Sequence, residues 1–95
     1  MDLVLAYDID TTTPQGRRRL RLVARLCEGY GQRVQFSVFE LVVSEKQYPR
    51  LLADLSALLD AADYVRIYRL DIGALDRVTE LGTRRHLPHR ESWIL

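Results

Sequence analysis

Two acids follow directly after an apolar run near the start of the chain, where carboxylates could bind a divalent metal. Residues 3–7 are all apolar, and Asp8 and Asp10 come next. Mg²⁺ takes near-octahedral oxygen ligands, often one or two carboxylates with waters and phosphate. One carboxylate holds the ion poorly, so a twofold axis near Asp8 would have to supply a second. Asp8 could instead cap a turn or pair with an arginine, and Asp10 is better explained as a turn residue that binds the backbone near Thr12.

A block of arginines begins one loop later. From Arg17 to Arg33, six arginines stand against one acid, although the net charge of the whole chain is only +1. The guanidinium group suits bidentate phosphate contacts. A GC-rich genome could explain the general preference for arginine, but it does not explain the clustering. The distribution therefore predicts a local phosphate-binding surface.

Other reactive side chains have simpler explanations. Cys27 is the single cysteine, and we interpret it as a buried thiol of a cytosolic protein. Ser37 has no base near it in the sequence, so hydrogen bonding in a turn is its better role. His86 and His89 flank Pro88, and a solvated loop explains them better than a metal pair does.

The acids and the arginines must be positioned by a strand and a helix. The apolar run over residues 3–9 predicts a strand that is buried on both faces and central in a sheet. Thr13 is the expected N-cap of a helix with Pro14 at its first position, where the missing N–H costs nothing. The helix is expected to run to about Glu28. Its solvated side carries Arg18, Arg21 and Arg25.

Residues 33–43 are rich in strand-forming side chains, but the inward parity changes midway. Val34, Phe36 and Val38 occupy even positions, whereas Phe39, Leu41 and Val43 occupy odd ones. A straight strand cannot change faces, because its side chains alternate with a period of two. We therefore predict a tight hairpin near Ser37, with Phe36 and Phe39 as core or interface aromatics.

The second half of the chain predicts one more helix and one more strand. Ser44 and Gln47 resemble a capping box, but Pro49, at the fifth position of that helix, would remove a hydrogen bond. An alternative is that the regular helix starts nearer Tyr48. Residues 64–70 read as a strand. Two shorter candidates follow, "VTEL" at 78–81 and "SWIL" at 92–95.

The element order is β-α-β-β-α-β with a C-terminal extension. This order predicts an α+β, ferredoxin-like fold, in which a four-stranded antiparallel sheet carries two helices on one face. We expect one domain over residues 1–95, with a core at 1–70 and an extension at 71–95. The extra C-terminal strand could pair with the sheet edge of a second copy, which would make a homodimer.

No apolar run approaches the roughly 18 to 20 residues that cross a bilayer. The start of the chain also lacks the basic region of a signal peptide. We therefore expect a cytoplasmic protein that does not associate with membranes.

Several stretches together resemble the CRISPR-associated protein 2 family. These are "YDI" at the end of the first strand, a basic helix ending in "GYG", the stretch "QRVQFSVFE", and a late "VRIY" strand. The resemblance spans residues 1 to about 70. It implies a ferredoxin-like homodimer that works in spacer acquisition with the CRISPR-associated integrase. It also implies the nuclease activity on RNA or DNA, dependent on Mg²⁺ or Mn²⁺, that some members of the family have.

The resemblance also implies functional residues. The family's metal-binding acid ends the first strand and matches Asp8. Residues linked to activity match Tyr7, Arg19, Arg21, Arg33 and Phe39. Arg19 and Arg21 do not share a helix face, so at most one of them is expected to point at the acid site.

Four functions follow from these observations. The first is a dimeric scaffold that binds nucleic acid for the integrase, and the second is a metal-dependent endonuclease acting on single-stranded RNA or duplex DNA through Asp8. A third is a toxin-type ribonuclease of the same fold. A small-molecule regulator is a fourth, but no glycine-rich loop or pocket motif supports it.

Overall fold

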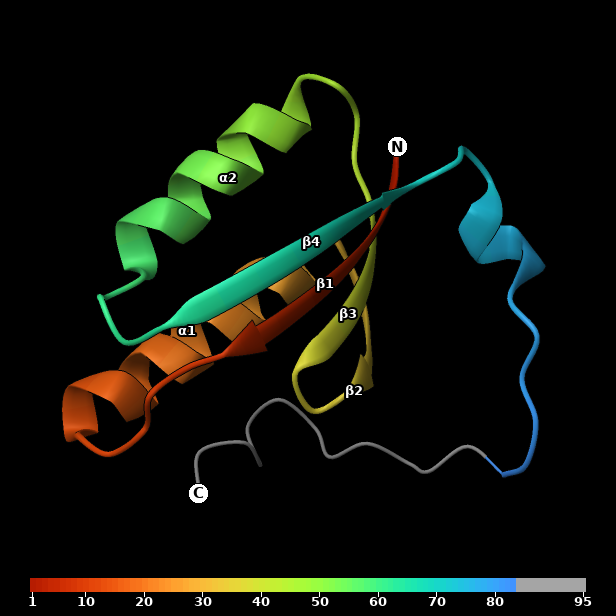
Figure 1. Ribbon diagram of the computed structural model, residues 1–95. Helices are drawn as coiled ribbons and strands as arrows, with labels where there is room; N and C mark the ends of the chain where they lie inside the picture. The colour runs from red at the N-terminus through yellow and green to blue at the C-terminus, as the bar shows by residue number, and fades with distance from the viewer. Residues whose placement is uncertain (84–95) are drawn as a thin grey trace.

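The computed structural model describes residues 1–83, and within them the predicted α+β, ferredoxin-like fold is confirmed (Figure 1). The elements, in chain order, are β1 (Asp2–Asp8), α1 (Pro14–Glu28), β2 (Gly31–Gln35), β3 (Val38–Val42), α2 (Gln47–Leu58), β4 (Tyr64–Leu70) and the 3-10 turn η1 (Ala74–Arg77). The four strands form an antiparallel sheet in the order β2-β3-β1-β4. The strand that ends in Asp8 is therefore central, as predicted.

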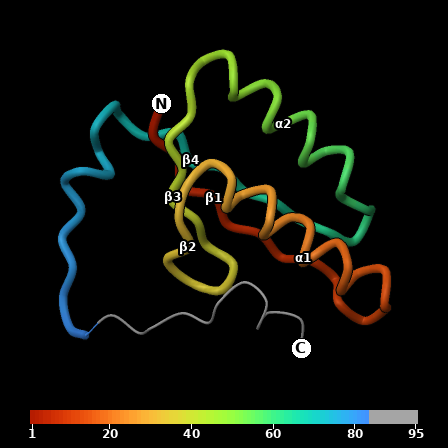
Figure 2. Tube along the Cα trace, turned by 180° about the vertical axis from the view of Figure 1, so that it is seen from behind, coloured from red at the N-terminus to blue at the C-terminus, as the bar shows by residue number. Residues whose placement is uncertain are grey.

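One face of the sheet is covered by the helices, and their apolar side chains complete the core. Leu3 and Leu5 of β1 belong to the same buried cluster as Val23 of α1 and Leu51 and Leu55 of α2. Seen from behind, α1 lies over the sheet and runs along the direction of β1 (Figure 2). Burial of these side chains supplies most of the favourable free energy that a domain of this size has.

The opposite face of the sheet, which we call the open face, is only partly covered. Alternation along the strands and their register assign its side chains. They are Val4, Ala6 and Asp8 of β1, Val38, Glu40 and Val42 of β3, and Tyr64, Arg66 and Tyr68 of β4. Three large ones are well exposed: Val42 at 61%, Tyr64 at 55% and Tyr68 at 47%. The prediction that β1 is buried on both faces is therefore wrong for a single chain, because both helices lie on one side.

The predicted capping contacts are present at both helices, although α2 itself begins at Gln47 with Lys46 at its N-cap position. The Thr13 hydroxyl accepts a hydrogen bond from the Gly16 N–H at 3.0 Å, and Pro14 follows the cap. Ser44 and Gln47 form a reciprocal capping box: each backbone N–H donates to the other's side-chain oxygen, at 2.8 and 3.1 Å. Pro49 lies in the first turn of α2, which begins at Gln47. Backbone N–H groups in a first turn have no partner within the helix, so the missing N–H of proline costs little there.

The predicted hairpin is also present, but three of its residues lie differently from the prediction. The turn occupies Phe36 and Ser37, and the register shifts between Arg33 and Gln35. The bulge changes the side-chain parity of β2 at Val34, which is only partly buried. Phe36 lies in the turn itself and is 59% exposed, and Val38 is partly buried on the open face. Phe39, at 0% exposure, is the core aromatic.

Beyond β4 the structure differs from the prediction. The sequence "VTEL" at 78–81 is not a strand; the chain instead forms η1 and then continues without regular structure. Asp2, buried under this segment, accepts a hydrogen bond from the Leu75 N–H at 3.0 Å. The predicted strand at 92–95, His86 and His89 lie outside the described residues. Over residues 1–83, neither helix combines the length and the apolar character that crossing a membrane requires.

Candidate metal and nucleic-acid site

Asp8 ends the central strand with its side chain exposed on the open face. It lies opposite Tyr64 of β4, and the backbone of β1 is paired up to this position. Its carboxylate is an oxygen donor of the kind that Mg²⁺ takes, together with waters and phosphate. Within residues 1–83, no three potential ligand side chains gather closely enough to hold a metal. One chain therefore offers one carboxylate, which fits half of a metal site.

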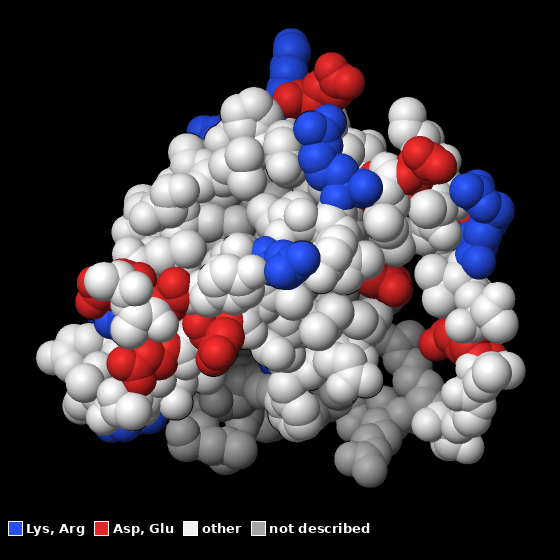
Figure 3. Space-filling model, viewed as in Figure 1, with Lys and Arg blue, Asp and Glu red and all other residues white. Residues whose placement is uncertain are grey.

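Other acids surround this end of the sheet. Figure 3 shows acidic side chains gathered where β1 ends and β4 begins, with basic side chains only at the margin there. Asp10 lies in the loop after β1, and Asp60 and Asp63 lie in the turn before β4. The contacts of these three acids decide whether their charges are available to a cation.

Asp10 is a turn residue, as predicted. Its carboxylate accepts the Thr12 backbone N–H at 3.0 Å and the Thr12 hydroxyl at 2.7 Å. These two hydrogen bonds stabilise the ionised form and lower the pKa of Asp10. The side chain is thus used inside its own loop.

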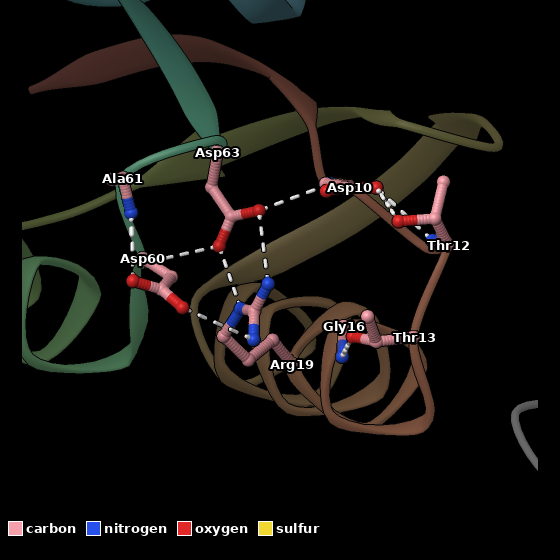
Figure 4. A network of polar contacts seen from close by, with 8 residues as sticks. All are labelled: Asp10, Thr12, Thr13, Gly16, Arg19, Asp60, Ala61 and Asp63. Carbon is pink, nitrogen blue, oxygen red and sulfur yellow. Dashed lines mark hydrogen bonds and ion pairs between the residues drawn. The ribbon is translucent and has the colours of Figure 1, made fainter.

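Arg19 points at acids of another segment. Its Nε donates to Asp63 Oδ2 at 2.7 Å, its Nη2 lies 3.4 Å from Asp63 Oδ1, and its Nη1 lies 3.7 Å from Asp60 (Figure 4). The Asp63 side chain is 0% exposed, and it also accepts the backbone N–H groups of Asp10 and Asp60 at 3.0 and 2.9 Å. Arg19 therefore ties α1 to the turn before β4.

Asp63 is a residue that the sequence reasoning missed. It lies between an apolar helix and a strand, where a polar residue usually belongs to an ordinary turn. Its partners Arg19 and Asp10 are 44 and 53 residues away. No local spacing connects such distant residues, so only the fold reveals their contact.

Three of the residues implied by the resemblance form one cluster at the hairpin. The rings of Tyr7 and Phe39 stack with centroids 6.1 Å apart, and the Arg33 guanidinium lies 4.9 Å from the Phe39 centroid. The Tyr7 hydroxyl and Arg33 Nη1 both donate to the Phe36 carbonyl, at 3.2 and 2.9 Å. The Tyr7 N–H also donates to the Ser37 carbonyl at 3.0 Å. The cluster fastens the hairpin turn to the strand that carries Asp8.

Tyr7 is protonated throughout the physiological range. Burial raises its pKa to about 12, although nearby Arg33 acts in the opposite direction. Burial likewise raises the pKa of the Cys27 thiol to about 12. The phenol therefore acts as a hydrogen-bond donor, and the thiol stays neutral in the core, as the sequence predicted.

The remaining arginines of α1 form its outer surface. Arg17, Arg18 and Arg25 are exposed, and Arg21 is half-buried. Arg21 follows Arg19 by two positions, about 200° around the helix, so the two side chains leave in nearly opposite directions. Of the two, Arg19 contacts acids, but these are Asp60 and Asp63 rather than Asp8. The expectation that at most one of the pair points at the Asp8 site stays a prediction.

A comparison with protein families matches residues 1–78 to the model of the family described as CRISPR associated protein Cas2. The chain is 45% identical over 83 residues to the CRISPR-associated endoribonuclease Cas2 3 of Rhodospirillum rubrum, covering 86% of this chain and 87% of that protein. It is 41% identical over 85 residues to the CRISPR-associated endonuclease Cas2 of Halalkalibacterium halodurans, covering 88% of each.

Solved structures show the same likeness. The crystal structure of Streptococcus pyogenes Cas2 at pH 6.5 superposes with a TM-score of 0.75 and 43% sequence identity, covering 86% of this chain and 100% of that one. A hypothetical protein of Thermus thermophilus has a TM-score of 0.69 and 32% identity, covering 90% of this chain and 94% of that one.

Proposed function

Because this chain belongs to the CRISPR associated protein Cas2 family, we propose that it serves in the acquisition of new spacers. In this proposal a homodimer binds nucleic acid and acts as a scaffold for the CRISPR-associated integrase in the cytoplasm. Asp8 from both copies holds one Mg²⁺ or Mn²⁺, and the dimer hydrolyses phosphodiesters there. The exposed carboxylate at the end of the central strand is the observation that carries the metal site.

The outer surface of α1 supports nucleic-acid binding. Arg18, Arg21 and Arg25 recur at helical spacing on the side away from the sheet. Guanidinium groups in such a row bind successive phosphates, so they read the backbone and shape of the nucleic acid more than its sequence.

The open face supports a homodimer. Val42, Tyr64 and Tyr68 expose about half or more of their surfaces there, and a second copy would remove this apolar area from water. A twofold axis across this face near Asp8 would bring two copies of its carboxylate together. At about 5 Å and an effective dielectric near 20, two such charges repel by roughly 3 kcal/mol, which a divalent cation between them would relieve.

The roles of the surrounding residues in hydrolysis follow from their contacts. A divalent cation bound at Asp8 would polarise the phosphodiester and lower the pKa of a bound water. Asp8 holds the charge at the strand end, while Tyr7, Phe39 and Arg33 fix that strand to the hairpin. In this proposal these three residues support the site from inside the fold, and the exposed arginines of α1 hold the rest of the substrate.

The scaffold role is tested by the salt dependence of duplex DNA binding. We expect affinity to fall steeply between about 50 and 200 mM salt. Replacing Arg18 or Arg25 by alanine should reduce the slope of log affinity against log salt by about one for each phosphate that the protein no longer neutralises. Arg50→Ala, at the exposed start of α2, is the matched control. Affinity that does not change with salt would contradict this role.

The nuclease role is tested by cleavage of single-stranded RNA and duplex DNA with Mg²⁺ or Mn²⁺. Both substrates are needed, because one relative is named an endoribonuclease and another an endonuclease. We expect Asp8→Ala to abolish cleavage, with Asp54→Asn on the exposed side of α2 as the control. Cleavage by Asp8→Ala at the wild-type rate would assign the activity to another site or to a contaminant.

A further inference from the structure

Asp63 is a buried carboxylate that joins three segments of the chain. It accepts four hydrogen bonds from three residues, Asp10, Arg19 and Asp60, while its side chain is 0% exposed. The bonds join α1, the loop after β1 and the turn before β4 (Figure 4). A buried carboxylate is stable only when its charge and its lone pairs are satisfied, and here Arg19 supplies the opposite charge.

The hydrogen bond from Asp10 acts on the backbone that leads away from Asp8. The Asp10 N–H is held by Asp63, and its carbonyl oxygen lies so close to Gly16 that a Cβ there would overlap it. The backbone of Asp10, two residues beyond Asp8, is thus constrained at its N–H by Asp63 and at its carbonyl by the close approach of Gly16. Ile9, which lies between Asp8 and Asp10 in the chain, is buried, with 7% of its surface exposed.

The same carboxylate acts on the other strand beside Asp8. Asp63 directly precedes Tyr64, and Tyr64 is the register partner of Asp8. The end of β1 is therefore linked to the start of β4 in two ways. Asp8 is the register partner of Tyr64, and two residues later the Asp10 N–H donates to Asp63, the residue before Tyr64. An ordinary strand end frays, whereas this one is closed by a charged, buried acceptor.

We propose that Asp63, held by Arg19, is a positioning residue that fixes the Asp8 carboxylate for its metal. This inference rests on the proposed function, since it concerns the same metal site. It assigns Arg19 to the support of Asp8 through Asp63 rather than to a phosphate of the substrate. Mutation of a residue that positions a metal ligand through hydrogen bonds typically weakens metal affinity by about 10- to 100-fold.

The test measures two properties of the purified full-length dimer. The first is hydrogen exchange of the Asp10 amide, and the second is Mn²⁺ binding, followed by paramagnetic broadening of amide signals near Asp8. Asp63→Asn removes the negative charge, and Arg19→Lys keeps the positive charge but cannot make the two-pronged hydrogen bond. Arg50→Lys is the same chemical change at an exposed arginine near the start of α2, outside the proposed binding surface, and it is the matched control.

We expect faster exchange of the Asp10 amide and about 10- to 100-fold weaker Mn²⁺ binding in Asp63→Asn. Arg19→Lys should show a smaller change of the same kind, and Arg50→Lys should behave as wild type. If Asp63→Asn does not fold, Arg19→Lys decides the question. Mn²⁺ affinity within error of wild type in every folded variant of this pair would overturn the inference.

Failure of the proposed function would look different. Wild-type protein that binds no Mn²⁺ near Asp8 would contradict the metal site itself, and the positioning role would fall with it. Mn²⁺ binding that is abolished in Asp8→Ala but unchanged in Asp63→Asn and Arg19→Lys would keep the metal site and reject only the role of Asp63.

Discussion

At the scale of single residues, the side chains implied by the family divide into exposed and buried ones. Asp8 is exposed at the strand end, whereas Tyr7 and Phe39 are buried beneath it with Arg33 beside the Phe39 ring. Loss of activity on replacing a buried residue can therefore arise from loss of structure. Stability must be measured alongside activity to separate the two causes.

Tyr7→Phe removes one hydrogen bond and leaves the ring stack in place. The Phe36 carbonyl keeps its bond from Arg33, so we expect the free energy of unfolding to fall by only about 1 kcal/mol. Phe39→Ala should lower it by about 3 to 5 kcal/mol, because it empties the core beneath Asp8. Urea unfolding measures both. A Tyr7→Phe variant of normal stability that loses all cleavage would show a direct chemical role for the phenol.

The Arg19–Asp63 pair predicts how stability depends on pH. Hydrogen bonds from Arg19 lower the pKa of Asp63 to about 2, from an ordinary value of 3.8. A carboxyl with a lowered pKa stabilises the fold above its unfolded-state pKa, and this contribution is lost as the pH falls toward the folded-state value.

We therefore expect the difference in Tm between wild type and Asp63→Asn to be constant above pH 5 and to shrink between about pH 4 and pH 2. Thermal unfolding followed by circular dichroism at several pH values measures it. A difference that stays constant over this whole acidic range would show that the charge of Asp63 contributes nothing.

At the scale of elements, the sequence predicts what depends on neighbouring residues. The cap at Thr13, the capping box of Ser44 and Gln47, and the Asp10 turn all join side chains to a backbone a few positions away, so spacing alone identifies them. The hairpin is also identified by a local pattern, the change of inward-facing side chains from even to odd positions along residues 33–43. This pattern misplaces Phe36, because the turn falls on Phe36 itself, and it misplaces Val34, because a bulge leaves no signal in the residue types.

Longer-range features could not be predicted in this way. The contact of Arg19 with Asp63 depends on how α1 lies against β4, and burial of β1 on one face only depends on where both helices pack. The segment 78–81 has the residue pattern of a strand but does not pair within the described residues. Residues with high strand propensity form a strand only when a neighbouring strand is available to pair with them, and the residue pattern alone does not identify that neighbour.

Gly16 tests how closely α1 lies against the loop after β1. A Cβ at this position would overlap the Asp10 carbonyl oxygen, which is backbone and cannot easily move away. We expect Gly16→Ala to lower the free energy of unfolding by about 1 to 3 kcal/mol, despite the better helix propensity of alanine. Gln15→Ala, exposed in the same turn, is the control. Equal or greater stability for Gly16→Ala would contradict the close approach.

At the scale of the whole molecule, a single chain leaves the site incomplete. The open face exposes apolar side chains, and Asp8 lies at its end without the additional ligands that a divalent cation needs within residues 1–83. Dimerisation through this face would address both features at once. The two copies would share one acidic site, and the arginine rows of α1 would lie on the outside of the pair.

A charge on the open face should therefore separate the copies. We expect Val42→Lys, at a side chain that is 61% exposed, to weaken dimerisation at least about tenfold, because a lysine would be desolvated in each copy. Leu52→Lys on α2, exposed at 37%, is the matched control and should leave the dimer intact. Sedimentation equilibrium measures both. An unchanged dimer in Val42→Lys would place the interface elsewhere.

The stoichiometry of Mn²⁺ binding tests the central claim most directly, because half of the metal site is proposed to lie in each chain. Calorimetric titration of the wild-type dimer should give one Mn²⁺ for two chains, and Asp8→Ala should abolish this binding. One Mn²⁺ for each chain, or unchanged binding in Asp8→Ala, would contradict a metal site shared between two copies of Asp8.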